Sequence, residues 1–420
     1  MTVRFRPWVI VALIALGVFL RTVWIGDMEY KEDEEINVAF LGKLGSSSYT
    51  PLAPVSQHAG IAHSSGFYYL IGLFLGGSRD PLVAGIVVAV INSVFLAAAL
   101  WIARHHDVMR YVLALCATSI VMVVYSRKIW QADLFVPWIF FGLALLAVGL
   151  RVPPGFKRSG TLFLSSLCLV LAMHMYLGAG IAAFVVGTYL FVWFLATGRR
   201  QDAFSWAAGL VLGGLSFIPW MIAILKNVPG SHGPSALAAH LEWDQLRSLA
   251  GTALTLPTPN QFYDVYLKEN ARDLLSGQWG MLFRITRFFI HLAIGFGSAA
   301  FWLALISIIA GWRKALRDPL LAAGLCAVII NIPVVFMMRL GNYMHYWLGV
   351  VPLAFYLMAW TATETPHRRL VVPQRVLVMG LCMTSALASI CFLALVHARQ
   401  GLPGEYGWAY RALVENKASP

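Results

Sequence analysis

The sequence predicts an all-α polytopic membrane protein with about 11 transmembrane helices. Two observations come from composition: 59% of the 420 residues are apolar and only 12% are charged, and the mean hydropathy is +0.73. The third is that apolar runs close to the length that crosses a bilayer, about 17 to 25 residues, recur along the whole chain. The five cysteines lie inside these runs without paired spacing, which indicates small apolar side chains rather than disulfides or metal ligands.

The first apolar run follows a short basic N-terminal segment and is longer than the core of a signal peptide. We therefore expect an uncleaved first span. A second run, 64–77, is too short to cross the membrane and is expected to lie at its surface as an interfacial helix. The expected spans cover residues 8–25, 81–103, 111–125, 134–150, 161–177, 181–197, 203–225, 288–312, 319–338, 346–363 and 376–396.

Basic residues are concentrated in the loops on one side of these spans. With the N-terminus in the cytoplasm, the inner loops hold 15 of the 31 Lys and Arg residues and four of the 19 acids. These loops are 1–7, 104–110, 151–160, 198–202, 313–318 and 364–375. The positive-inside rule therefore predicts a cytoplasmic N-terminus and a periplasmic C-terminus in a bacterial inner membrane. The net charge of +12 then reflects topology, and no nucleic-acid partner is expected.

The sequence offers no boundary for a separate soluble domain, so we expect one integral membrane domain over residues 1–420. Its outer side would carry a first loop (26–80), a large loop (226–287) and a C-terminal tail (397–420). Long loops over a membrane site often act as lids, and 226–287 could do so or recognise an acceptor. The alternative is a simple connector.

Acidic residues are concentrated directly after the first span, where six of the 19 acids fall within residues 27–35. Desolvating a carboxylate at a membrane surface costs several kcal/mol unless the group is paired or used. Asp33 and Glu34 could take a proton from an acceptor hydroxyl. They could instead ligate a divalent metal together with His58. The acids could serve with or without a metal, so the sequence leaves metal dependence open and makes no cofactor certain. The alternative is a solvated acidic edge.

Two short outer turns carry basic and aromatic residues. Arg127 and Lys128 lie between the third and fourth spans, where a guanidinium fork or an ammonium would suit a phosphate. Snorkelling and a local pair with Asp133 would explain the same residues without a ligand. In the second turn, Arg339, Tyr343 and His345 could contact a phosphate or sugar hydroxyls. No Walker loop, HExxH or GxSxG occurs where its structure could form, which argues against direct use of a cytosolic nucleotide.

In this order, the features resemble the GT-C superfamily of membrane glycosyltransferases. The branch resembled is that of the protein O-mannosyltransferases and lipid A aminoarabinose transferases. The matching features are Asp33-Glu34 after the first span, His63 to Tyr69 before the second, Arg127 with Asp133, the large loop 226–287, and Arg339 to Pro352. The chain departs from the family at Ser64-Ser65, which replace the usual prolines.

The resemblance implies transfer of a sugar from a polyprenyl-phosphate donor, with inversion, at the periplasmic face. The acceptor would be a glycolipid, a polysaccharide or a protein, and membrane lipids would surround the site. The implied roles are catalysis by Asp33 and Glu34, phosphate binding by Arg127, Lys128 and Arg339, and substrate binding by His63, Tyr68, Asp133, Tyr343 and His345. Two alternatives remain: a transporter or flippase for a lipid-linked or anionic solute, and a surface-glycan polymerase or ligase.

Overall fold

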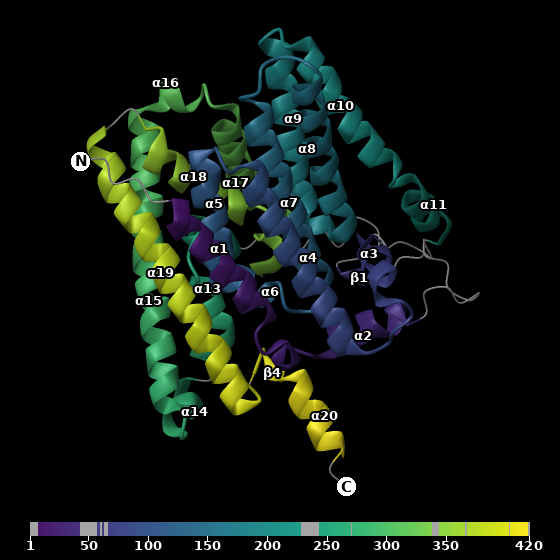
Figure 1. Cartoon of the computed structure of the whole chain (residues 1–420), viewed down its shortest axis with the longest axis vertical. Helices are drawn as coiled ribbons and strands as arrows, with labels where there is room; N and C mark the ends of the chain where they lie inside the picture. Colours follow the sequence, from purple (N-terminus) through teal and green to yellow (C-terminus); the bar gives the residue numbers. More distant parts are fainter. Residues whose placement is uncertain are drawn as a thin grey trace.

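The structure is a computed structural model that describes residues 7–42, 57–58, 61–62, 66–227, 243–269, 271–337, 344–365, 368–402 and 404–418. Helices make up almost all the regular structure in these ranges (Figure 1). The strands described form two antiparallel hairpins of two-residue strands: β1 (Gln57–His58) with β2 (Ile61–Ala62), and β3 (Gly401–Leu402) with β4 (Gly407–Trp408). The all-α class predicted from composition is confirmed.

Among the described residues, six helices are long and apolar enough to cross a membrane. They are α4 (Pro81–Ile102), α7 (Gln131–Gly149), α8 (Phe156–Met175), α15 (Gly280–Ala310), α17 (Pro319–Met337) and α19 (Arg368–Arg399). Shorter apolar helices accompany them: α1 (Pro7–Thr22), α3 (Gly66–Leu75), α9 (Gly180–Ala196) and α18 (Val351–Thr363). The chain is a multi-pass membrane protein by its apolar helices, and the number of eleven spans stays a prediction.

The predicted span 111–125 is broken into α5 (Asp107–Thr118) and α6 (Ile120–Tyr125). At the break, the carbonyls of Cys116 and Ala117 accept hydrogen bonds from the guanidinium of Arg21, each at 2.9 Å. A carbonyl without a partner inside a bilayer costs several kcal/mol, so Arg21 makes the break tolerable. The predicted span 203–225 is likewise divided, into α10 (Arg200–Leu215) and α11 (Ile218–Asn227).

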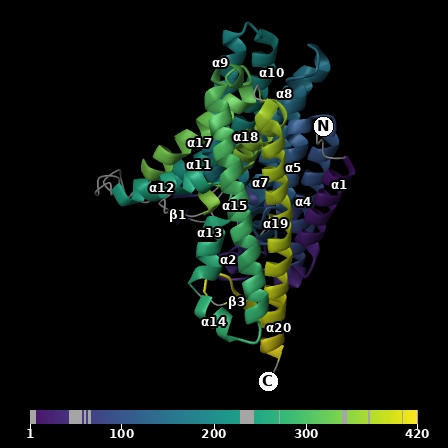
Figure 2. The same cartoon turned by 90° about the vertical axis from the view of Figure 1, so that its left-hand side faces the viewer.

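Two helices are much longer than the spans predicted for them. α15 has 31 residues and α19 has 32, so each is about 47 Å long at 1.5 Å per residue. The hydrocarbon core of a bilayer is only about 30 Å thick. The two helices lie side by side and reach beyond their neighbours at the end of the bundle that carries α14 (Ala271–Ser276) and α20 (Tyr410–Ala418) (Figures 1 and 2).

The predicted outer segments contain short helices. The first loop forms η1 (Ile25–Asp27), α2 (Glu32–Leu41) and α3, so the interfacial run 64–77 contains a ten-residue helix. The large loop contains α12 (Trp243–Thr255), α13 (Asn260–Tyr263), the π-helix η4 (Asp264–Lys268) and α14, and its last residues belong to α15. The remaining short helices are η2 (Leu177–Ala179), α16 (Trp312–Ala315) and η5 (Met344–Tyr346).

Candidate active site

The acidic run forms the first turn of α2, where four carboxylates meet the positive end of the helix dipole. Glu34 closes a capping box, because its carboxylate accepts the backbone N–H of Lys31 at 3.0 Å. The helical repeat then separates the neighbouring acids. Glu34 is 3% exposed, whereas Asp33 is on the exposed side of the same turn. The turn therefore offers three exposed carboxylates, those of Glu32, Asp33 and Glu35, and one, that of Glu34, which is buried and hydrogen-bonded.

Lys128 lies next to this turn, in a buried cluster of polar side chains that it forms with Glu29 and Tyr266. Its ammonium pairs with the carboxylate of Glu29, and the two side chains are 7% and 5% exposed. It also donates a hydrogen bond to the hydroxyl of Tyr266 at 2.8 Å. Lys31, at 3.0 Å, pairs with the other carboxylate oxygen of Glu29. One carboxylate is thus shared by a buried and a half-exposed cation.

Burial and the neighbouring charges shift the pKa values of these groups in opposite directions. Burial alone would lower the pKa of Lys128, but Glu29 holds that pKa well above its usual value, so the ammonium stays charged. Burial raises the pKa of Glu34 to about 7, against the opposing pull of Lys128. A carboxyl group with a pKa near neutrality can both take up and release a proton under physiological conditions.

Asp133 is a further buried acid in this region. It lies in the first turn of α7, 1% exposed, within electrostatic range of Lys128. Its backbone carbonyl accepts from Asn92 at 3.2 Å. Within the described ranges, neither of its carboxylate oxygens has a hydrogen-bond partner. Buried polar groups are almost always hydrogen-bonded, so this carboxyl group is a candidate contact for a ligand.

Aromatic rings line the side of the site near Asp33. Trp130 meets the ring of His345 edge-on at a centroid distance of 4.7 Å, and Tyr176 meets it at 5.9 Å. The negative charge of Asp33 is close enough to Tyr176 to contribute to raising the pKa of that hydroxyl, after burial and the neighbouring Tyr346. The predicted substrate residue His345 therefore lies in an aromatic wall of which one member, Tyr176, is within electrostatic range of Asp33.

Two predicted site residues are committed to the scaffold. Arg127 is 2% exposed and donates to the carbonyls at the end of α1, including those of Leu20 at 2.8 Å and Trp24 at 2.6 Å. Phosphate binding by Arg127 and Lys128 stays a prediction, and the carbonyl contacts of Arg127 make it less favourable for that residue than for Lys128. The buried Tyr68 donates to Asn37 at 2.5 Å and so joins α3 to α2.

Other predicted residues fall outside what the structure describes. His63, Arg339 and Tyr343 lie outside the described residues, and of His58 only the backbone is described, in strand β1. Among the described residues, no group of three or more His, Cys, Asp or Glu side chains gathers where it could hold a metal ion. The metal set of Asp33, Glu34 and His58 therefore stays untested.

Sequence reasoning missed Tyr266, which reaches Lys128 from the π-helix η4. π-Helical turns are rare overall but are often found at functional sites, and no residue pattern predicts one.

Sequence reasoning also missed a contact between the C-terminal segment and the first loop. Asp27, 2% exposed, lies 2.6 Å from His397 and 3.2 Å from Arg411. Glu29 forms a β-bridge with Ala409 in the same segment.

Comparison with known proteins finds relatives by structure alone. No family model and no curated protein matches the sequence. The Archaeoglobus fulgidus oligosaccharyltransferase matches 91% of this chain with a TM-score of 0.56 and 12% identity, but only 52% of its own chain is covered. This chain thus spans about half the length of that relative. ArnT from Cupriavidus metallidurans in the apo state matches 93% of this chain and 76% of its own, with a TM-score of 0.50 and 14% identity. The predicted resemblance to GT-C membrane glycosyltransferases is confirmed at the level of the fold.

Proposed function

We propose that this chain is a membrane glycosyltransferase that moves a sugar from a polyprenyl-phosphate donor to an acceptor hydroxyl at the periplasmic face. The observation that carries the proposal is the buried Lys128–Glu29 pair next to the turn of α2 that carries the exposed Asp33, on a fold shared with GT-C enzymes. A cation held in a site poor in water is suited to a leaving phosphate. A carboxylate beside it is suited to an incoming hydroxyl. Acceptors of the proposed reaction are a glycolipid, a polysaccharide or a protein.

In the proposed reaction, Asp33 takes the proton of the acceptor hydroxyl as its oxygen forms a bond to the anomeric carbon. The bond from that carbon to the phosphate oxygen breaks on the opposite face, which inverts the configuration. The carrier phosphate leaves with the bonding electron pair, and Lys128 neutralises its charge, with Arg339 as a further predicted contact. Lys128 can turn towards the phosphate because Lys31, 3.0 Å from Glu29, keeps that carboxylate paired.

Glu34 and Asp133 have supporting roles in this proposal. Glu34 fixes the first turn of α2 through its hydrogen bond to the Lys31 N–H and so orients Asp33. Asp133 is assigned to the sugar, because a buried carboxylate without a hydrogen-bond partner in the described structure can accept from a sugar hydroxyl.

A transporter or flippase is the main alternative, and the two functions differ in where they need charge. Transporters place ionisable residues near the middle of the membrane, at the interface of repeats. Here Asp33, Lys128 and Glu29 lie in turns and short helices outside the long apolar helices. This placement favours a transferase, and a surface-glycan polymerase or ligase would share it.

A glycan and lipid mass profile of cells tests the proposal. Cells would carry the wild type, a deletion, Asp33→Asn or the control Glu32→Gln, which removes an exposed acid from the same turn. Loss of a general base typically costs 10²–10⁴-fold in rate, so we expect Asp33→Asn to lose the sugar increment that the deletion loses. Glu32→Gln should retain it. Full activity of Asp33→Asn at equal protein level would overturn the assignment, and an accumulated unflipped carrier-linked precursor in the deletion would favour transport.

A further inference from the structure

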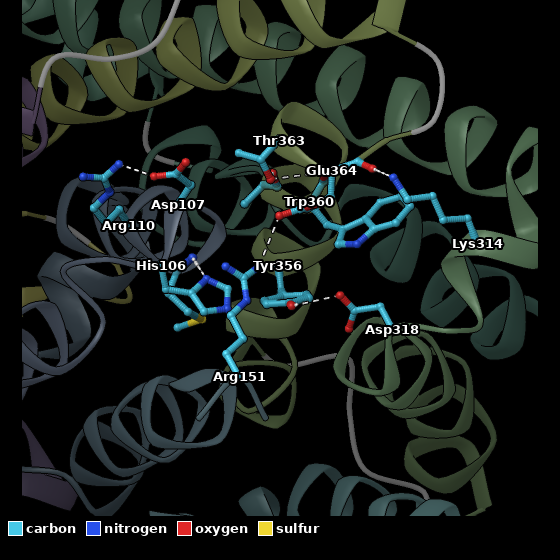
Figure 3. A network of polar contacts seen from close by, with 12 residues as sticks. His106, Asp107, Arg110, Arg151, Lys314, Asp318, Tyr356, Trp360, Thr363 and Glu364 are labelled. Carbon is cyan, nitrogen blue, oxygen red and sulfur yellow. Dashed lines mark hydrogen bonds and ion pairs between the residues drawn. The ribbon is translucent and has the colours of Figure 1, made fainter. Parts of the chain in front are cut away.

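A cavity of about 430 Å³ lies at the opposite end of the bundle, among residues that the charge distribution assigns to the cytoplasmic side. Its walls come from four separate segments. They are the residue before α5 (His106), the segment after α7 (Arg151), the segment from α16 to the start of α17 (Lys314, Arg317 and Asp318), and the second half of α18 with the residue that follows it (Tyr356, Trp360 and Glu364). Figure 3 shows seven of these side chains and the polar contacts between them: His106, Arg151, Lys314, Asp318, Tyr356, Trp360 and Glu364. Basic residues that serve only to fix the orientation of the protein in the membrane need not gather around a cavity.

The charges of the cavity do not balance. Arg151, Lys314 and Arg317 face two acids, Asp318 and Glu364. The carboxylate of Asp318 is already engaged, because it accepts the backbone N–H groups of residues 320 and 321 at the start of α17 and the hydroxyl of Tyr356 at 3.4 Å. Burial also raises the pKa of Asp318. An excess of positive charge therefore faces the cavity.

The remaining contacts leave donors available to a ligand. Arg151 pairs with Glu364 at 3.1 Å, but both side chains are about half exposed, so the pair is weak and exchangeable. Lys314 donates to the backbone carbonyl of Glu364 and has no carboxylate partner within the described ranges. In the same ranges, the guanidinium of Arg317 has no hydrogen-bond or ion-pair partner, although its backbone N–H donates to the carbonyl of Lys314 at 3.1 Å.

His106 adds a neutral donor to the cavity wall. Burial, and then the nearby Arg151, lower its pKa to about 4, so the ring is neutral at neutral pH. Its Nδ1 accepts the backbone N–H of Met109 at 3.3 Å, which places the ring proton on Nε2. Trp360 and Tyr356, 2% and 3% exposed, form an aromatic wall. Guanidinium and ammonium groups beside a neutral N–H donor are the set that recognises a phosphate group.

We propose that this cavity binds the phosphate group of an anionic ligand from the cytoplasmic side, with Arg317 and Lys314 as its main contacts. Arg151 joins them when it leaves Glu364. The phosphate belongs either to the headgroup of an anionic phospholipid or to a soluble phosphate ester. Basic pockets between membrane helices on the cytoplasmic side are a known place for such headgroups. The site is independent of the proposed transferase reaction, because its residues lie at the other end of the helices.

Binding of phosphatidylglycerol to the purified full chain, measured by native mass spectrometry against phosphatidylcholine, tests the proposal. The variants are Arg317→Gln and Lys314→Gln. The matched control is Arg313→Gln, which removes the same charge from the same turn at a side chain that lies over Trp312, outside the cavity lining. A Lys or Arg side chain near a membrane surface contributes about 1 kcal/mol to the binding of anionic lipid, which corresponds to about fivefold in affinity.

We expect the Arg317 and Lys314 variants each to bind phosphatidylglycerol about fivefold more weakly, with the Arg313 variant close to wild type. Competition by glycerol 3-phosphate at equal affinity would support the site and identify a soluble ester as its ligand. Competition only by lipid would support the site and identify a headgroup. Equal losses in all three variants, or no preference over phosphatidylcholine, would overturn the proposal. Asp33→Asn should bind the lipid like wild type, so failure of the transferase proposal would leave this result unchanged.

Discussion

Replacement of Lys128 by methionine tests whether the buried ion pair organises the candidate site. The side chains of Lys128 and Glu29 are 7% and 5% exposed, so the variant leaves a buried carboxylate without its nearest cation. Removing one partner of a buried pair typically costs about 3–5 kcal/mol. We expect the lower end, about 3 kcal/mol of unfolding free energy, because Lys31 remains 3.0 Å from the same carboxylate.

The measurement is denaturant unfolding of the purified chain in detergent micelles, followed by the fluorescence of its 15 tryptophans. Lys268→Met is the control, because Lys268 pairs with Asp264 at 3.1 Å with both side chains exposed, at 66% and 44%. Exposed pairs contribute about 0–1 kcal/mol. The double variant Glu29→Gln with Lys128→Met should recover part of the loss, since no buried charge is then left alone. If Lys128→Met costs no more than Lys268→Met, the pair does not hold the site together.

Three further predictions concern other contacts of the predicted first loop, 26–80. Burial raises the pKa of Glu34 to about 7 in the native state from an ordinary 4.5, so the native state binds this proton more tightly than the unfolded state. The free energy of unfolding should therefore fall by about 3 kcal/mol as the pH rises from 4.5 to 7, and the Glu34→Gln variant should lack that decline in the same titration. A Cβ at Gly66 would lie 2.7 Å from a backbone oxygen of α8, so Gly66→Ala should destabilise by about 1–3 kcal/mol in thermal melts, whereas Gly214→Ala, with open space around it, should not. Asp27→Asn should release the C-terminal segment and speed tryptic cleavage at Arg411; an unchanged cleavage rate would show that the ion pair does not hold that segment.

The sequence allowed much of the architecture to be predicted, because hydropathy and charge are local properties. Composition predicted the all-α class, and the short apolar run before the second span predicted the helix that forms as α3. Hydropathy failed where helices continue past the membrane. Arg284 and Arg287 interrupt the apolar pattern of α15 without ending the helix, so its predicted start at 288 was eight residues late against the observed Gly280.

Partners distant in sequence could not be predicted. The acidic run indicated a site, but only the fold shows that Glu34 is buried beside Lys128 while Asp33 stays exposed. Arg127 and Lys128 are adjacent and chemically alike, yet one is used by carbonyl groups at the end of α1 and the other by Glu29. That difference depends on where helix ends fall in space, which residue type and spacing do not encode.

The contact between Asp27 and the C-terminal segment has a consequence for the biosynthesis of the protein. The two members of the Asp27–His397 contact are 370 residues apart, which at about 5–20 residues per second separates their synthesis by about 20–70 s. Throughout that interval the acidic loop is already made, while His397, Arg411 and the β-bridge partner Ala409 are still missing. This end of the helix bundle therefore acquires its final shape only after the segment that carries His397, Ala409 and Arg411 has been made. A chain arrested late in translation would carry nearly all its helices and still lack an assembled first loop.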